Sequence, residues 1–340
     1  MSKITLNKTY GIHTIELYVK DLKYSEVQRV IDFLMKEGKI QKIKSDPYNI
    51  DQQFKSTYFV KDGLRLRIYQ SHNKSNGIGF IINPSTLLVG KYQPLNLWVP
   101  TIDTVDKLLK RLITFMNKCC GLSLHPKDFS LSQLDITYND KLEQATAADL
   151  IGCYRKGLIP RNYQRHNSKD KEEKRHFYAI YTNKIMFKLY DKIYELEQND
   201  RCPKELKGDK ILRYEISMKR EAFLKKLGLD RKDTLYDMLN TAYNDGKDMI
   251  DEYLDKKLHP FPNRWASYET AKKKIKSGIK SQKLQEQMLY LIKKVSDSSG
   301  LDTATRKLKE HYKDVDDRRI KKIFSAFDEL GISPITLPKK

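Results

Sequence analysis

The feature that most constrains this chain of 340 residues is an internal repeat of predicted elements. Apolar alternation and turn residues predict a strand, a helix, a hairpin, a strand and a helix, and this order occurs twice, about 120 residues apart. The first copy comprises GIHTIELYVK (11–20), SEVQRVIDFLMKE (25–37), STYFV with LRLRIYQ (56–70), IGFIIN (78–83) and a short helix after it. The second comprises FSLSQLDITYND (129–140), TAADLIGCYRKG (146–157), RHFYAIYT with KIMFKLYD (175–191), ILRYEISMK (211–219) and EAFLKKLGLD (221–230). The repeat predicts an α+β fold of two antiparallel sheets with helices packed on them.

Three regions follow from this organisation. Residues 1–120 hold the first copy and a helix at 102–119, and we expect them to bind DNA or to be structural. Residues 121–264 hold the second copy, in which we expect the catalytic site. Residues 265–340 are basic and helical, as in KKKIKSGIKSQKLQEQMLYLIKKV and RRIKKIFSAFDELGI, and their charged face is either a solvated surface or one that binds DNA or a partner.

The charge balance indicates a polyanionic partner. Lys and Arg number 65 against 44 Asp and Glu, a formal net charge of +21 that is spread along the whole chain. An anionic membrane is the alternative, but no basic amphipathic helix with a Trp, Phe or Leu face stands out, so nucleic acid is favoured and no membrane contact is expected. The four cysteines, of which Cys119 and Cys120 are adjacent and the other two are scattered, form no CxxC motif and predict no zinc site. The absence of a signal-like apolar segment favours a cytoplasmic protein.

Two acidic residues stand among apolar neighbours on predicted strands of the second copy. Asp135 lies between Leu134 and Ile136, and Glu215 between Tyr214 and Ile216. A buried carboxylate is costly unless it is paired or binds a cation, and two carboxylates without His or Cys suit Mg²⁺ or Mn²⁺. The alternative is that both acids face solvent and pair with Lys or Arg.

The repeat provides an internal control. In an overlay of the two copies, Tyr190 meets Tyr69, Asp135 meets Glu16, and Glu215 meets Ile81. A residue that only the fold needs should often persist in both copies, so the acid at 215 indicates a site and the tyrosine at 190 taken alone does not.

Tyr190 has neighbours that could activate it. Lys188 and Lys192 stand two positions before and after it, on the same face if the strand continues that far. Their charges could lower the pKa of the phenol and hold a phosphate. A tyrosine that attacks a DNA phosphate forms a phosphotyrosyl link, which conserves the bond energy for later rejoining.

Three motifs of the second copy resemble those of the phage and plasmid replication initiators of the II/X type, the filamentous-phage gene II protein and its relatives. The matching segments are Ser132-Gln133-Leu134-Asp135, then Tyr190-Asp191-Lys192-Ile193-Tyr194-Glu195-Leu196, then Arg213-Tyr214-Glu215 followed by LKKLGL at 224–229. LRIYQSHNKS, INPSTLLVG and FDELGISP extend the resemblance over most of the chain. Gln133 departs from the family pattern, which has Arg there. The same signature is similar to that of Rep_trans rolling-circle initiators of plasmids.

This resemblance implies a metal-dependent nickase that starts rolling-circle replication at a double-stranded origin and later rejoins the displaced single strand. Tyr190 would be the nucleophile, Lys192 its helper at the scissile phosphate, Asp135 and Glu215 the ligands of Mg²⁺ or Mn²⁺, and Glu195 a weaker ligand. We expect the cations in contact with DNA to include Lys188, Arg213, Lys219 and Arg220. A host helicase and a polymerase would be the protein partners.

Other functions stay open at this point. A conjugative relaxase uses the same chemistry, an origin-binding control protein would lack the chemistry, and an RNA-binding protein would stack bases on strands such as HFYAIYT. No P-loop, GxSxG, HExxH or dinucleotide motif occurs. The chain also lacks the His-hydrophobe-His pair with which the other large class of rolling-circle enzymes binds its metal.

Overall fold

The computed structural model describes residues 8–43, 52–56, 59–71, 75–143, 145–230, 232–254, 265–297 and 300–338. Its strands are β1 (Lys8–Leu22), β2 (Ile40–Ile43), β3 (Gln52–Ser56), β4 (Leu64–Gln70), β5 (Asn76–Ile82), β6 (Phe129–Lys141), β7 (Gln164–Arg165), β8 (Phe177–Tyr181), β9 (Ile185–Asp191) and β10 (Ile211–Lys219). Its helices are α1 (Tyr24–Lys36), α2 (Pro84–Val89), α3 (Ile102–Cys120), α4 (Ala147–Lys156), α5 (Lys171–His176), α6 (Lys192–Gln198), α7 (Arg220–Leu227), α8 (Leu235–Glu252), α9 (Tyr268–Gly278), α10 (Gln282–Asp297), α11 (Leu301–His311) and α12 (Asp317–Glu329).

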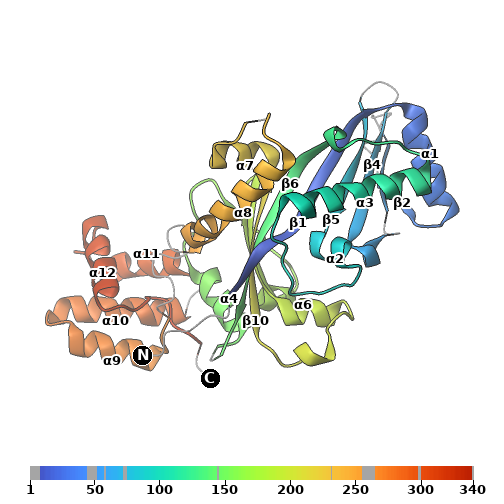
Figure 1. The fold of residues 1–340 in the computed structure, drawn as a ribbon. Helices are drawn as coiled ribbons and strands as arrows, with labels where there is room; N and C mark the ends of the chain where they lie inside the picture. Colours follow the sequence, from blue (N-terminus) through green and yellow to red (C-terminus); the bar gives the residue numbers. More distant parts are fainter. Residues whose placement is uncertain are drawn as a thin grey trace.

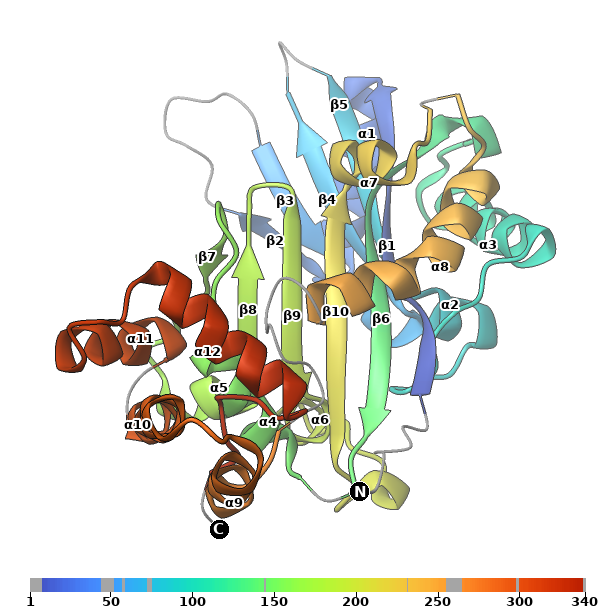
Figure 2. The ribbon, with the colours of Figure 1, turned by 90° about the vertical axis from the view of Figure 1, so that its left-hand side faces the viewer.

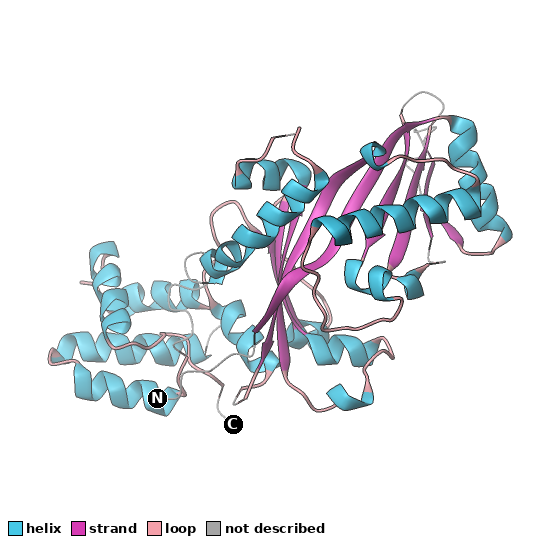
Figure 3. Ribbon diagram, viewed as in Figure 1, coloured by secondary structure: helices cyan, strands magenta, loops and turns pink. Residues whose placement is uncertain are grey.

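All strands of both copies join in one antiparallel sheet (Figures 1 and 3). The ten strands follow the order β2-β3-β4-β5-β1-β6-β10-β9-β8-β7. We call residues 8–89 the first unit and residues 129–227 the second unit. The α+β class is confirmed. The expectation of two separate sheets is corrected, because the first strands of the units, β1 and β6, pair with each other along most of their length.

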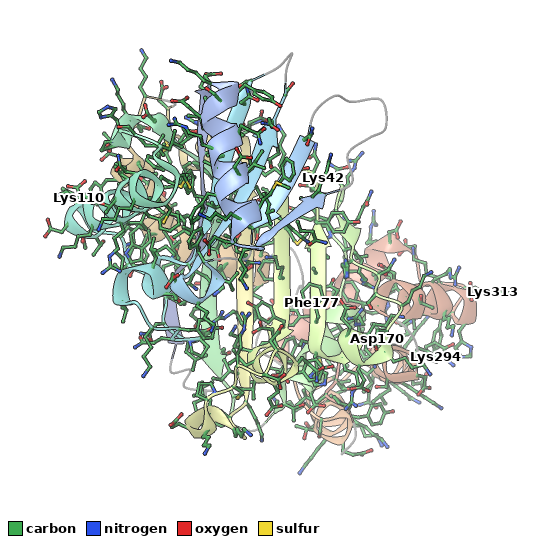
Figure 4. The ribbon with its side chains drawn as sticks, turned by 90° about the vertical axis from the view of Figure 1, so that its right-hand side faces the viewer. Lys42, Lys110, Asp170, Phe177, Lys294 and Lys313 are labelled. Carbon is green, nitrogen blue, oxygen red and sulfur yellow. The ribbon has the colours of Figure 1, made fainter. Side chains whose placement is uncertain are left out.

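One face of the sheet is covered by helices, and the other, which we call the open face, is covered in part by α6 and the segment after α2. In β4 the buried residues Leu64, Leu66 and Ile68 alternate with the exposed Arg65 and Arg67, as expected for a strand with one buried face. Helices α1, α3, α4, α7 and α8 cover the apolar face; Figure 2 shows α7 and α8 in front of β10 and β6. Figure 4, from the opposite side, shows the strands of the second unit with α6 in front of their lower ends.

Local sequence signals place most of these elements. Thr146 caps α4 through the backbone N–H of Asp149, and Asn83 caps α2 with Pro84 as its first residue. One predicted strand is wrong. STYFV contributes only Ser56 to β3, residues 57 and 58 lie outside the described part, and a 3₁₀ turn occupies Val60–Asp62. Helix α8, which covers the centre of the sheet, and the short elements β2, β7, α5 and α6 were not predicted.

The C-terminal region packs around a core of its own. Met288, Leu291 and Ile323 belong to an apolar cluster that helices α9 to α12 share with Cys153 of α4. All four cysteines are free thiols. Within the described residues, no helix combines the length and the apolarity that crossing a membrane requires.

Candidate active site

The register of three central strands brings the predicted site residues onto the open face. Glu215 in β10 lies opposite Lys188 in β9 and opposite Thr137 in β6. Arg213 lies opposite Tyr190, and Ser217 opposite Asp135. Residues directly opposite each other in an antiparallel pair share a face, so the predicted acids, Tyr190 and Lys188 meet in one polar cluster.

Glu215 is the centre of this cluster. It is only 3% exposed, and its carboxylate forms an ion pair with the ammonium of Lys188 through Oε1. The hydroxyl of Tyr190 donates to its Oε2 at 3.3 Å, and Nδ1 of His13 lies 3.7 Å from the same oxygen. Burial raises the pKa of Glu215, but Lys188, through its charge and its hydrogen bond, acts together with the other neighbouring cations to outweigh burial and hold this pKa well below its usual range.

Arg213 lies beneath Tyr190. It is fully buried, its Nε donates to Asn139 Oδ1 at 2.6 Å and its Nη2 to the carbonyl of Pro94 at 2.6 Å. Its Nη1 finds no partner among the described residues. Burial and the charge of Glu215 raise the pKa of Tyr190 well above its usual value, while Arg213 lowers it. The guanidinium is therefore placed to stabilise negative charge that develops on or beside the phenol.

Lys192 approaches Tyr190 from a helix rather than from the strand. The strand ends at Asp191, whose carboxylate accepts hydrogen bonds from the N–H groups of Ile193 and Tyr194 and caps α6. Lys192, the first helical residue, is 2% exposed, and its Nζ lies 2.5 Å from Glu195 and 6.0 Å from the Tyr190 ring centroid. Burial first, and then the charge of Arg213, lower its pKa to about 8.

A divalent cation fits the chemistry around Asp135, although the described residues contain no group of three or more His, Cys, Asp or Glu side chains arranged to hold a metal ion. Burial and the charge of Glu215 raise the pKa of Asp135. The buried hydroxyl of Thr137, between the two acids, has no partner among the described residues. Two close carboxylates and an unpartnered hydroxyl are oxygen donors of the kind that Mg²⁺ and Mn²⁺ prefer. In this structure the ammonium of Lys188, rather than a divalent cation, neutralises the charge of Glu215.

His13 is a further candidate ligand that the sequence did not indicate. The β1–β6 register runs from Ile12 opposite Ile136 directly to Thr14 opposite Asp135, so His13 is the extra residue of a β-bulge. Burial and the neighbouring cations, Arg213 before the lysines, lower the pKa of its imidazole to about 3. The neutral ring has one nitrogen lone pair that a metal can use, and its Nδ1 also lies 3.1 Å from the Thr14 hydroxyl.

The other predicted residues take different places. Glu195 pairs with Lys192 rather than with the acids, so the ligand role expected for it finds no support in this geometry. A surface contact of Arg213 with DNA does not fit its complete burial. Lys219 is exposed at the end of β10 opposite Gln133, whereas Arg220 opens α7 and its buried Nε has no partner among the described residues.

Cavities lie on both sides of Tyr190. One of about 410 Å³ is lined by Lys61, Arg65, Lys192 and Arg201 among others. The other, of about 390 Å³, has aromatic walls that include Phe177 and Tyr194. Phe177, labelled in Figure 4, lies opposite Tyr190 across β8 and β9. His176, stacked on Tyr194 at a centroid distance of 3.7 Å and bonded to Asp191, was also missed by the sequence interpretation.

The two units carry related but unequal sites. In β4, Tyr69 lies opposite Gly77 and Arg67 opposite Gly79, as Tyr190 lies opposite Arg213 and Lys188 opposite Glu215. Glu215 therefore corresponds to Gly79, two residues from the Ile81 of the sequence overlay. Glu16, the counterpart of Asp135, keeps an ion pair of 3.5 Å with Arg67. The first unit thus has a tyrosine, a cation and one acid, but glycines where the second unit has Arg213 and Glu215.

The chain matches no protein-family model and no curated protein sequence. The resemblance to the II/X-type initiators therefore rests on the motifs, and the site is interpreted from its own residues.

Proposed function

We propose that the protein is a metal-dependent DNA nickase and strand transferase of the cytoplasm that initiates rolling-circle replication. The observation that carries the proposal is the polar cluster around Tyr190, which joins a phenol, a buried guanidinium, two lysines and two carboxylates on an open sheet face. The motif resemblance to the II/X-type initiators supports the same function. DNA is the substrate, first as a double-stranded origin and later as a displaced single strand.

The cutting step needs a nucleophile and two proton transfers. Tyr190 Oη attacks the scissile phosphorus, a P–Oη bond forms, and the bond from phosphorus to the 3′ oxygen breaks. The phenolic proton leaves along the hydrogen bond to Glu215 Oε2 and is passed on to solvent, because the low pKa of Glu215 does not let its carboxylate keep the proton. The departing 3′ oxygen takes a proton from the Lys192 ammonium, which becomes neutral. A 3′-OH then attacks the phosphotyrosine, and the reversed transfers rejoin the strand.

Positive charge around the phosphate stabilises the transition state. Arg213 lies under the Tyr190 ring, with its Cζ 6.0 Å from the ring centroid, and its buried charge offsets negative charge that develops on the phenol and the phosphate. Asp135, Thr137 and Glu215 would hold Mg²⁺ or Mn²⁺, with His13 near Glu215 Oε2. The bound cation would polarise the phosphate and offset the negative charges that now raise the pKa of Tyr190.

Binding to the DNA backbone follows from the charge of the whole chain. The net charge is +21, and lysines such as Lys42, Lys110, Lys294 and Lys313 project from the periphery of the molecule (Figure 4). We expect phosphate-dominated binding whose affinity falls steeply with salt. A host helicase and a polymerase would continue from the exposed 3′ end.

The test uses supercoiled plasmids that carry a library of inserts, incubated with the protein and Mn²⁺ or Mg²⁺. The expected result is a nicked circle with protein bound covalently to the 5′ end and a 3′-OH that a polymerase extends. Sequencing the extended ends then locates the origin. Salt-dependent binding without any adduct would contradict the proposal and favour an origin-binding or RNA-binding protein instead.

A further inference from the structure

The cavity of about 410 Å³ beside Tyr190 is built by both units. The first unit contributes the turn at Lys61 and Gly63 and the start of β4 at Arg65. The second unit contributes Tyr190 and Lys192, and Arg201 follows α6. Because residues of the first unit form part of the cavity wall, they contact whatever ligand the cavity binds beside Tyr190.

The lining is cationic. It contains Lys61, Arg65, Lys192 and Arg201, and its one acid is Glu195, which is already paired with Lys192. Lys61 and Arg65 are exposed and form no ion pair with any described residue. Ile81 and Tyr92 add apolar and aromatic wall. Such a lining suits a ligand with an anionic group on an apolar body, and the volume lies in the range of small-ligand sites.

The basic turn of the first unit is held in a fixed place. Gly63 has a φ of 79°, and a Cβ at this position would lie 2.7 Å from Thr86 Cβ and 2.9 Å from the Asn83 carbonyl. The N–H of Asn83 donates to the carbonyl of Gly63 at 2.7 Å. The turn is therefore pressed against the start of α2, which lowers the entropy cost of presenting Lys61 and Arg65 to a ligand.

The second unit shows that the fold does not need this cation. Arg65 lies opposite Ile81 in β5, and the corresponding position opposite Ser217 in β10 is Met186. The same place in the sheet accepts an uncharged side chain in one unit and carries an arginine that borders the cavity in the other. Arg67 lies two residues further along β4, forms an ion pair with Glu16 and does not line the cavity.

We propose that this cavity binds the nucleotide of the cleaved DNA strand that adjoins the scissile phosphate, with Lys61, Arg65 and Arg201 around its phosphate. The inference rests on the proposed function, since it assigns the strand to the substrate of Tyr190. It makes the first unit a part of the active site. The sugar and base lie against Ile81 and Tyr92, while the scissile phosphate remains at Tyr190.

The first experiment measures binding without cutting. Thymidine 3′,5′-bisphosphate and the other three deoxynucleoside bisphosphates are titrated into the full-length protein by calorimetry. Arg65→Met, which copies the residue of the second unit, should weaken the binding at least tenfold, and Lys61→Met should do likewise. The matched control Arg67→Met should change it less than twofold. Failure of all four compounds to bind, or equal weakening by Arg67→Met, would overturn the inference.

The second experiment separates this inference from the proposed function. Oligonucleotides with one neutral methylphosphonate linkage at successive positions are bound to wild-type protein and to Arg65→Met. A neutral linkage next to the scissile position should weaken the binding of wild-type protein but not that of Arg65→Met. The two changes are not additive because each removes one side of the same contact, the phosphate charge or the Arg65 charge. Additive losses at every position would contradict the inference even if the protein nicks DNA. Binding of bisphosphates by a protein that forms no adduct would uphold the cavity and refute the nickase.

Discussion

Tyr190 and Tyr69 occupy equivalent positions in the two units of the sheet, yet only Tyr190 has an acid and an arginine on the neighbouring strand. Tyr190 donates to Glu215 and lies above Arg213, whereas Tyr69 lies opposite Gly77 and packs edge-on against Tyr18 at a centroid distance of 5.9 Å. The fold thus keeps a tyrosine in both places and surrounds it with the charged residues of the proposed site in one. The difference gives each test of the active site a matched control in the same chain.

Removal of a carboxylate from the predicted metal site should abolish the response of the protein to Mn²⁺. At a concentration one hundred times its dissociation constant, a ligand that binds only the folded state stabilises it by about 2.7 kcal/mol. Wild-type protein should therefore show a rise in Tm with Mn²⁺ that Asp135→Asn and Glu215→Gln lose. Glu16→Gln, the change at the counterpart of Asp135, should keep the rise. An equal response in all four proteins would remove the metal site.

The nicking rate should fall as the pH rises through about 8. Burial and Arg213 lower the pKa of Lys192 to about 8, and the proposed acid acts only while it is protonated, so its contribution is present below this pKa and lost above it. Lys192→Arg should flatten this alkaline limb because arginine stays protonated. Lys192→Ala should lower the rate about 10²- to 10⁴-fold, the usual range for a general acid. Single-turnover nicking from about pH 6 to about pH 9.5 measures both effects.

An unchanged alkaline limb in Lys192→Arg would assign the titration to another group. A Lys192→Ala rate close to wild type would remove the acid role.

Asn139 should prove important for stability although it lies outside the sequence motifs. Its Oδ1 accepts from Arg213 Nε at 2.6 Å, and its Nδ2 donates to the Leu95 carbonyl at 3.0 Å. Asn139→Ala leaves a buried charged donor without its acceptor, and we expect a loss of about 2 kcal/mol in the free energy of unfolding. Gln133→Ala, which loses one bond of 3.4 Å to Asp135, should cost less than about 0.5 kcal/mol. Urea denaturation compares them, and equal losses would contradict the role of Asn139.

Local patterns were enough to predict most strands and helices, and the open face of the sheet shows why. Alternation along β4 and β9 is sufficient to put Arg67 and Lys188 on the polar face, because the period of a strand is a local property. Caps such as Thr146 and Asn83 likewise act over three or four residues.

The arrangement of the site was beyond local patterns. The overlay placed Glu215 two residues away from its true counterpart, Gly79, because the pairing register depends on contacts far apart in the sequence. The β-bulge at His13 arises from pairing with β6, more than a hundred residues later. The burial of Arg213 depends on Asn139 and Pro94, and the basic cavity needs both units. The register, the bulge, the burial of Arg213 and the cavity all depend on contacts between residues far apart in the sequence.

The central claim is that Tyr190 alone forms the covalent link to DNA. Two Tyr→Phe substitutions, each of which removes only the hydroxyl group, test this claim most directly. Wild type, Tyr190→Phe and Tyr69→Phe are incubated with Mn²⁺ and an oligonucleotide that contains the cleavage site. The covalent product is then digested and mapped by mass spectrometry. We predict no adduct in Tyr190→Phe at unchanged DNA affinity, and an adduct on Tyr190 in wild type and Tyr69→Phe. An adduct that persists in Tyr190→Phe, or one that maps to another tyrosine such as Tyr194, would contradict the account.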